Sequence, residues 1–416
     1  MKIIVAHPDR QQSFFTATAL EQEGMLFKYI TTVYNKPGSL TSRLGKLLKG
    51  NDKKKADSRY CSAIPDEKVV QYLEIPALIS LVLIRLPNCR PLYRKWRRFV
   101  NHRFAKKVAQ YAIKNNVDAV ISYDFCSDEL FSILKKKAPN IIRVLDVSIS
   151  NRAFMKTNYE KDIERTGDAR IKDEQIDLWD NRVIDSVISE IQDANYFLVP
   201  SQIVKKSLEF SGADSEKIKV IPYGVDTSKF EFVKKKDVNK PLRLIYVGQI
   251  SFRKGLHHLL KVVSKYDPNR VKLTVAGAYT ADSIFVKEYG DKENIEFVGF
   301  ITRDILAKKY QESDAFIFPT LGEGYGLVVL EALSCGVPVI SSDLAGGNDA
   351  IIEGYNGYVF EAGNDDEMIE KIERLASLGT NIQQMSENAR KSAMEHTWDK
   401  YYSDVRAAMK EFILRK

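Results

Sequence analysis

The chain has 416 residues, of which 44% are hydrophobic and 28% are charged. This length and composition exclude a disordered or fibrous chain, and they suit two globular domains of about 200 residues each. The formal net charge of +8 is uneven, because residues 1–110 hold 21 Lys and Arg against 8 Asp and Glu, which leaves −5 for the remaining residues.

The first apolar run is short and breaks at His7-Pro8-Asp9, so we expect no secretory signal peptide. No stretch of about 18 apolar residues predicts a membrane-spanning helix. The cysteines at 61, 89, 126 and 335 form no CxxC pair, which is typical of reduced thiols. We therefore expect a cytoplasmic protein that attaches peripherally, if at all, to the inner face of the membrane.

Apolar runs alternate with helical patterns through the first half, which indicates a parallel sheet with helices on both faces. Buried strands are predicted at 2–6, 117–122, 141–146, 196–200 and 218–222, and helices at 128–137 and 201–211. A further helix is predicted at 93–111, where apolar residues recur at spacings of four, four, four and three, namely Trp96, Val100, Phe104, Val108 and Tyr111.

The other faces of the 93–111 helix are crowded with Arg and Lys, and residues 75–110 contain no acidic residue. Basic residues 85–107 suit an anionic membrane surface. The same pattern also fits a solvated basic face, or a site for an acidic acceptor glycan. Nucleic-acid binding is not expected, because no recognised motif accompanies the charge.

A polar stretch ending in a proline separates the halves at residues 222–241. A second alternating series then predicts strands at 242–248, 271–277, 295–299, 315–319 and 337–341, and a last helix begins at Trp398. The predicted fold is thus α/β, with two Rossmann-like doubly wound domains at 1–222 and 223–397 and a final helix at 398–416. Most strands of the second series end in Gly or Pro, at the sheet edge where open α/β sheets bind ligands.

The most specific motif is PTLGEGYGLVVLEALSCGVPVIS at 319–341. Glu323 precedes a helix predicted to open near Tyr325 or Gly326, and Glu331 lies within that helix. The glycines allow a tight turn and close approach of a ligand. The helix N-terminus offers unpaired N–H groups to a diphosphate, while carboxylates accept hydrogen bonds from sugar hydroxyls.

A second motif, YVGQISFRKGLHHLL at 246–260, reads as a strand, a loop and a helix. Gly248 ends the strand, and Arg253 and Lys254 lie where the loop meets the helix. Arg binds a phosphate bidentately and Lys adds a mobile charge, so this pair suits a departing nucleoside diphosphate.

From about Asp193 to Trp398 the sequence resembles glycosyltransferase family 4, whose members are retaining enzymes of the GT-B fold. VGQISFRKG, VGF, the segment with paired glutamates and NGYVF follow in the family's order. The resemblance implies that Arg253 and Lys254 bind the donor diphosphate. It also implies that Glu331 holds the ribose, and that Glu323 contacts the donor sugar and is the catalytic residue. Gly248, Tyr325, Gly326 and Leu327 would complete the donor site.

The resemblance further implies a final helix packed against the first domain and transfer without metal, and the sequence contains no DxD motif. Two departures stand out. Gln249 occupies the position where many members carry Arg, so one diphosphate contact is missing or is supplied by Arg253. The first loop, AHPDRQQ at 6–12, lacks the glycines of many members.

Other candidate residues are less specific. His7 follows the first strand, so it contacts the acceptor or donor sugar or is an ordinary surface-loop histidine; Asp146 ends a strand at the same edge and is a second acceptor-side candidate. His257 and His258 are adjacent in sequence, which argues against a same-face metal pair, and we interpret them as structural.

Together these features predict a retaining hexosyltransferase that moves a sugar from a nucleoside-diphosphate sugar to a hydroxyl of a glycan or lipid-linked acceptor. Cell-surface polysaccharide or glycolipid synthesis is the expected setting, with no cofactor and no metal. The alternatives are a sugar-nucleotide epimerase or hydrolase of related fold, and a non-enzymatic basic protein that binds membranes or nucleic acid.

Overall fold

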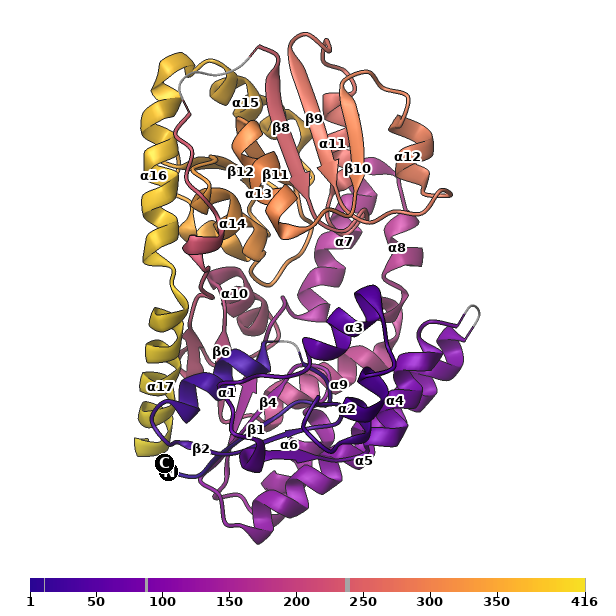
Figure 1. Cartoon of the computed structure of the whole chain (residues 1–416), viewed down its shortest axis with the longest axis vertical. Coiled ribbons are helices and arrows are strands. Elements are labelled where there is room, and N and C mark those ends of the chain that lie inside the picture. The colour runs from indigo at the N-terminus through magenta and orange to yellow at the C-terminus, as the bar shows by residue number, and fades with distance from the viewer. Residues whose placement is uncertain (11, 87–88, 236–239, 416) are drawn as a thin grey trace.

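The computed structural model describes residues 1–10, 12–86, 89–235 and 240–415 (Figure 1). Two parallel sheets lie one above the other, each between layers of helices. The first, in the order β3-β2-β1-β4-β5-β6-β7, consists of β1 (Ile3–Ala6), β2 (Leu26–Thr31), β3 (Val69–Gln71), β4 (Ala119–Tyr123), β5 (Ile142–Asp146), β6 (Tyr196–Val199) and β7 (Ile218–Val220). The second, in the order β10-β9-β8-β11-β12-β13, consists of β8 (Leu242–Val247), β9 (Val271–Ala276), β10 (Ile295–Gly299), β11 (Ala315–Phe318), β12 (Val339–Ser342) and β13 (Gly357–Phe360). The predicted fold class is confirmed.

The helices follow the strands in the alternation that the sequence predicts. Those of the first half are α1 (Ser13–Glu21), α2 (Leu40–Gly45), α3 (Gly50–Asp57), α4 (Glu74–Leu83), α5 (Arg90–Lys114), α6 (Asp128–Lys137), α7 (Arg152–Thr166), α8 (Arg170–Glu174), α9 (Asn181–Asp193) and α10 (Gln202–Phe210). Those of the second half are α11 (Leu256–Val263), α12 (Ile284–Tyr289), α13 (Arg303–Glu312), α14 (Leu327–Ser334), α15 (Asp365–Ala376), α16 (Ile382–Glu395) and α17 (Trp398–Leu414).

Three strands were not predicted, and several predicted strand boundaries differ by two residues, including the start of β4 at Ala119 and the end of β7 at Val220. β2 carries polar residues within its apolar run, and β3 and β13 are short, so none gives a strong periodic signal. The strand predicted at 337–341 begins only at Val339, after Pro338, which carries no N–H. Within the predicted join, residues 236–239 lie outside the described residues.

The core on the two faces of the first sheet follows from the alternation of side chains along its strands. Ile3 and Val5 of β1 belong to the core that contains α1 and α17. Ile4 and Ala6 point to the opposite face, where α5 and α6 cover the sheet. Both faces of the first sheet are therefore shielded from water, which explains the nearly continuous apolar runs from which buried strands were predicted.

Helix α5 turns its predicted apolar stripe inward. Val100, Phe104 and Val108 are buried, and the Trp96 indole donates a hydrogen bond to the Pro76 carbonyl at 2.8 Å. The stripe is therefore part of the core and does not face a membrane. Residues 87 and 88 of the predicted basic segment lie outside the described residues.

Helix α17 crosses back to the first half, as predicted. Trp398 stacks on Phe15 of α1 with ring centroids 3.7 Å apart, and Phe412 stacks on Tyr196 of β6 at 4.2 Å. Gly224 lies so close to this crossing that a Cβ there would be 2.3 Å from the Trp398 amide nitrogen. Across the described ranges, no helix combines the length and apolar character needed to span a bilayer.

The segment of α7 and α8 also crosses between the halves. It lies in the first half of the sequence, yet Met155, Tyr159 and Ile171 belong to the same core as β8 and β9 of the second sheet. Figure 1 shows α7 and α8 extending up to the second half, with α8 below α12. The Arg165 guanidinium pairs with Glu361 at 2.7 Å, and Arg170 pairs with Glu288 at 2.9 Å, so charges reinforce this apolar contact.

Candidate active site

A cavity of about 610 Å³ lies between the two halves, at the carboxyl edges of both sheets. The second half contributes most of its wall, including the predicted residues Gly248, Arg253, Lys254, Glu323, Tyr325, Gly326 and Leu327. The first half contributes Gln12, Phe125, Ser148, Ile149 and Tyr223. Two motifs separated by about seventy residues of sequence thus meet at one site, as expected for an open α/β sheet.

Two cations share one carboxylate in this cavity. Lys254 forms an ion pair with the Glu323 carboxylate, and the Arg253 guanidinium lies 3.5 Å from the same oxygen. Burial, followed by the charge of Arg253, lowers the pKa of Lys254 well below its usual value. One carboxylate neutralises only one of the two cations, so one positive charge remains unpaired in surroundings largely shielded from water. An anionic ligand would compensate that remaining charge.

Two helices aim their N-termini at the same region. Gly255 precedes α11, and Gly326 precedes α14 with φ of +80°. The predicted start of the second helix is therefore correct to within a residue or two. A Cβ on Gly326 would be 2.8 Å from the Phe318 ring, so the turn requires glycine there. The free N–H groups of these first turns add donors for an anion.

The loop that carries Glu323 is clamped by the first half of the chain. Ser201 donates a hydrogen bond to the Gly324 carbonyl at 2.7 Å, and Ser150 donates to the Glu323 carbonyl at 3.1 Å. A Cβ on Gly324 would be 1.8 Å from the Ser148 carbonyl oxygen. The sequence predicted that this glycine admits a ligand, whereas the structure uses it to admit the backbone of the other half.

The loop that carries Arg253 is held from the same side by Glu174 of α8. The Glu174 carboxylate accepts hydrogen bonds from the backbone N–H groups of Phe252, at 2.7 Å, and Arg253, at 3.2 Å. Gln249 accepts a hydrogen bond from the Arg253 guanidinium at 3.1 Å. Glu174 was not predicted, because it is distant in sequence and no motif surrounds it.

A second cavity of about 630 Å³ continues from the first along the carboxyl edge of the second sheet. The two share Val247, Gly248 and Gln249, and the second extends to Gly277 and Phe300. Arg253 and Lys254 line the first cavity and not the second, so the second offers room for a part of a ligand that lies away from the cations.

Glu331 lies one turn further along α14, on the helix face that carries Leu327 and Val328. It is half-buried, and burial raises the pKa of its carboxyl group. Its side chain makes no hydrogen bond or ion pair with any of the described residues. Its carboxylate is therefore available to accept hydrogen bonds, although it does not line the central cavity itself.

The two acceptor-side candidates lie beneath the cavity and do not line it. His7 is only 3% exposed, so the surface-loop interpretation is wrong; its Nδ1 accepts from the Asp9 N–H at 2.8 Å. Asp146 is also buried and accepts from the Thr16 hydroxyl at 3.0 Å. Burial raises the pKa of Asp146 to about 7. Thr16 also bonds Tyr401 of α17, which indicates that Asp146 supports the packing of that helix.

Phe125 is the most informative residue that sequence reasoning missed. It follows β4 and lines the cavity. Its backbone φ angle is +69°, which residues other than glycine rarely adopt. The buried Glu190 carboxylate holds the strained turn by accepting from the Phe125 and Ser127 amides, at 3.0 and 2.7 Å. The Arg152 guanidinium lies 4.2 Å from the centre of the Phe125 ring.

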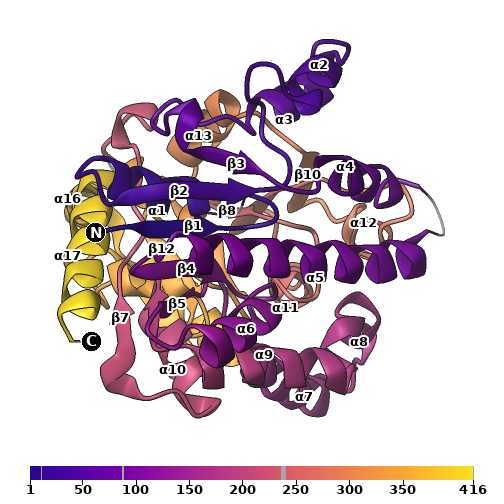
Figure 2. The ribbon, with the colours of Figure 1, turned by 90° about the horizontal axis from the view of Figure 1, so that it is seen from below.

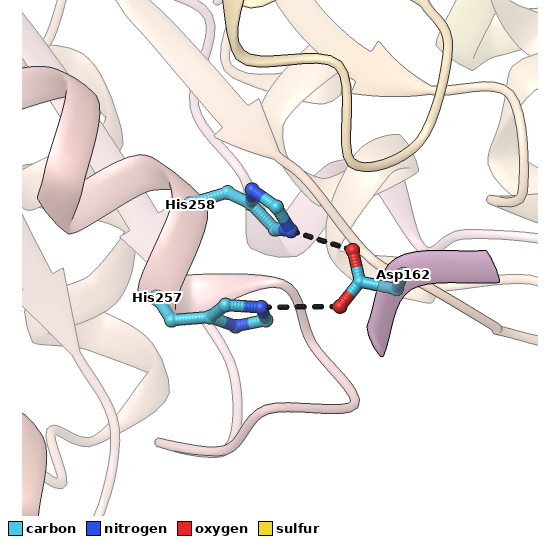
Figure 3. Close-up of side chains that lie close together, drawn as sticks. All are labelled: Asp162, His257 and His258. Carbon is cyan, nitrogen blue, oxygen red and sulfur yellow. Dashed lines mark hydrogen bonds and ion pairs between the residues drawn. The ribbon is translucent and has the colours of Figure 1, made fainter. Parts of the chain in front are cut away.

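Beside the cavity, His257 and His258 both reach the Asp162 carboxylate of α7 (Figure 3). Their adjacent positions argued against a same-face metal pair, yet the ligand atoms of Asp162, His257 and His258 lie within 4.8 Å of one another, because the two rings approach opposite oxygens at 3.4 and 2.8 Å. His258 also bonds Asp365 through Nδ1 at 2.6 Å. With a carboxylate on each ring nitrogen, His258 is held as an imidazolium, which has no lone pair for a metal.

The charge of His258 predicts a pH-dependent contribution to stability. Against the effect of burial, the bonds to Asp162 and Asp365 raise the pKa of His258 to about 9. The stabilisation is therefore complete below the unfolded pKa of about 6.5 and is lost as the pH rises through 9. We expect His258→Gln to lower the free energy of unfolding by about 2 kcal/mol near pH 6.5 and by much less near pH 10.

Urea denaturation of both proteins at the two pH values measures this difference. The matched control is His102→Gln, because His102 has a side chain that is 48% exposed. A difference between wild type and His258→Gln that stays constant with pH would show that the ring is neutral.

The part of the chain that carries most of this site is similar in sequence to known glycosyltransferases. Residues 227–392 match the family model of glycosyl transferases group 1. The capsular polysaccharide biosynthesis glycosyltransferase CapM of Staphylococcus aureus is 28% identical over 242 residues, which are 54% of this chain and 62% of that protein. A sulfoquinovosyl transferase of Arabidopsis thaliana is 28% identical over 219 residues, 49% of this chain and 42% of that protein. The chain thus spans about half the length of the curated relatives it matches.

Solved structures match over the whole chain. The sucrose-phosphate synthase of Thermosynechococcus elongatus has a TM-score of 0.69 with 100% of both chains covered and 16% identity. Anabaena HepE in complex with UDP-glucose has a TM-score of 0.62, covering 99% of this chain and 100% of that chain at 14% identity. The chain therefore has the GT-B fold of these glycosyltransferases, and its similarity in sequence to glycosyl transferases group 1 lies in the half that carries Arg253, Lys254, Glu323 and Glu331.

Proposed function

We propose that the protein transfers a sugar from a nucleoside-diphosphate sugar to a hydroxyl group of a glycan or lipid-linked acceptor, with retention of configuration and without a metal ion. The observation that carries this proposal is the convergence of Arg253, Lys254 and Glu323 at two helix N-termini inside the cavity between the halves. Cleavage of a sugar–phosphate bond leaves a diphosphate, and this arrangement offers fixed positive charge where that diphosphate develops.

Each residue has a distinct proposed role. Arg253 and Lys254 bind the diphosphate, and Glu331 accepts from the ribose hydroxyls. Glu323 exchanges its ion pair with Lys254 for hydrogen bonds to the donor sugar once the diphosphate arrives. The acceptor enters between Gln12, Phe125 and Tyr223 on the opposite wall, and its hydroxyl attacks on the face that the diphosphate vacates. Closure of the halves keeps water away from this bond.

The acceptor proposal draws on the relatives and on the charge of the first half. One relative is named for capsular polysaccharide biosynthesis and another for transfer of sulfoquinovose, so a polysaccharide or glycolipid product is the natural first choice. The basic residues within 85–107 support an acceptor that lies at an anionic membrane surface.

Nucleotide binding provides the first test. We expect one of UDP, GDP and ADP to raise the melting temperature, because a ligand that binds only the folded state adds about 2.7 kcal/mol of stability at a hundredfold excess over Kd. UDP-glucose is the first donor to try, since a structural neighbour was solved with it. Absence of a shift with every nucleoside diphosphate would reject the donor site.

Turnover then separates the alternatives. A transferase consumes the donor only slowly in water alone, a hydrolase releases free sugar rapidly, and an epimerase returns a changed nucleotide sugar. The anomeric configuration of the product, measured by proton NMR, tests retention directly, and an inverted product would contradict it.

A further inference from the structure

Helix α4 turns a row of apolar side chains toward solvent. Its buried face carries Ala77 and Ser80, whereas Ile75, Ile79 and Val82 are 61%, 40% and 56% exposed at spacings of four and three. Leu86, four residues further, is 46% exposed. A continuous exposed apolar stripe of this kind is unusual on a helix at a water-facing surface and marks an interaction site.

An apolar groove lies directly beside this stripe. It has a volume of about 510 Å³ and runs between α2, α3 and α4. Leu44, Leu47 and Leu48 form one wall, and Leu78, Leu81 and Val82 form the other. Leu47 is 78% exposed at the rim. A groove of this size suits a hydrocarbon chain, because most of its lining surface is apolar, although Arg10, Asp52 and Arg85 also line it.

Positive charge predominates around the stripe, although Arg85, Arg94 and Arg97 pair with Asp52, Asp177 and Asp9. Residues 75–110 hold nine Lys and Arg and no Asp or Glu. Arg90 and Lys95 are exposed, and neither forms an ion pair with any residue that the structure describes. Figures 1 and 2 both show α4 and α5 side by side, so the helix that carries these cations packs against the helix with the apolar stripe. Apolar side chains flanked by free cations match the surface of an anionic bilayer.

The groove also adjoins the active-site cavity. Arg10 lines the groove and Gln12 lines the cavity, and both belong to the loop between β1 and α1. A lipid whose chain occupied the groove would therefore present its polar end close to the cavity.

We propose that the face formed by α2, α3 and α4 docks onto an anionic lipid bilayer and that its groove holds one hydrocarbon chain of a membrane lipid. Charge complementarity selects the bilayer over other partners. The proposal rests on the lipid-linked acceptor of the proposed function. It assigns the membrane contact to the exposed stripe of α4, because the stripe of α5 is buried. It is tested with vesicles alone, so nucleotide binding and membrane binding succeed or fail separately.

Flotation with vesicles tests the docking face. We expect the wild type to float with vesicles of equal parts phosphatidylglycerol and phosphatidylcholine and to remain unbound with phosphatidylcholine alone. The double substitution Ile79→Glu and Val82→Glu should reduce the bound fraction about tenfold or more, because two apolar side chains that insert into the bilayer become negative charges that it repels. The matched control is Met394→Glu on α16, where the side chain is 58% exposed on the other half.

Two results would overturn the docking face. One is equal flotation of the wild type with both kinds of vesicle. The other is unchanged flotation of the double variant, provided that its melting temperature and nucleotide binding match those of the wild type. Light scattering of the protein without lipid tests whether a second copy of the chain occupies this face instead. A wild type that is dimeric and a double variant that is monomeric would assign the face to that second copy.

Fluorescence quenching tests the groove itself. Leu47→Trp should add tryptophan fluorescence to that of the wild type. Phosphatidylglycerol with brominated acyl chains should quench this added fluorescence strongly. Met394→Trp should not respond. Quenching of Leu47→Trp by aqueous iodide but not by the brominated chains would show that no hydrocarbon enters the groove, and would reject that part of the proposal.

Discussion

Lys254→Ala and Glu323→Gln are each expected to lower the rate of sugar transfer by about a hundredfold or more. The estimate follows from the loss of one charged contact to the reacting groups, made by side chains that are largely shielded from water. Lys254 is only 9% exposed, and Glu323 is its ion-pair partner, so solvent cannot replace either group. Steady-state transfer from the donor identified by thermal shift measures the loss.

The two variants should differ in nucleotide binding. Lys254→Ala removes a cation and weakens binding of the nucleoside diphosphate, whereas Glu323→Gln removes the competing carboxylate and should leave that binding equal or tighter. Lys265→Ala, an exposed lysine just beyond α11, serves as the control. Transfer at nearly the wild-type rate by Lys254→Ala or Glu323→Gln would reject the assigned roles.

Gly324→Ala is expected to lower transfer by a similar factor without touching the donor. The added Cβ would be 1.8 Å from the Ser148 carbonyl oxygen, so the Glu323 loop and the first half of the chain must separate. Displacement of a positioned group by about 1 Å costs on the order of a hundredfold in rate. The melting temperature should also fall, because the bond from Ser201 to the Gly324 carbonyl is lost.

Gly322→Ala provides the matched control on the same loop. Its Cβ would be 3.3 Å from the Tyr159 hydroxyl and 3.4 Å from the Met155 methyl group, contacts that a shift of a few tenths of an ångström relieves. We therefore expect Gly322→Ala to retain most activity. Equal activity of both alanine variants would show that the contact between the Glu323 loop and Ser148 does not position the site.

The sequence predicted those parts of the fold that depend on local patterns. Buried parallel strands such as β11 are continuous apolar runs. The helix of the Glu323 motif follows Gly326, whose left-handed conformation favours glycine. β3 and β13 escaped prediction because three or four residues show no period. The inward stripe of α5 was visible, but its burial depended on α4 and the sheet, which are distant in sequence.

The candidate site divides in the same way. Arg253, Lys254 and Glu323 were predicted because each lies at the carboxyl end of a recognisable strand. Glu174 and Glu190 were missed because they act through backbone N–H groups of distant loops, and such contacts leave no mark on the local sequence. Phe125 follows a predicted strand directly, so inspection of every strand end would have found it.

The passage of α7 and α8 into the second core limits how enzymes of this kind can be recombined. A hybrid joined at residues 222–241 would bring these two helices from one parent and their binding surface on β8 and β9 from the other. The Arg253 loop would then receive a foreign carboxylate in place of Glu174. A working exchange of donor specificity would instead transplant residues 152–179 together with the second half, and would leave α17 with its original α1.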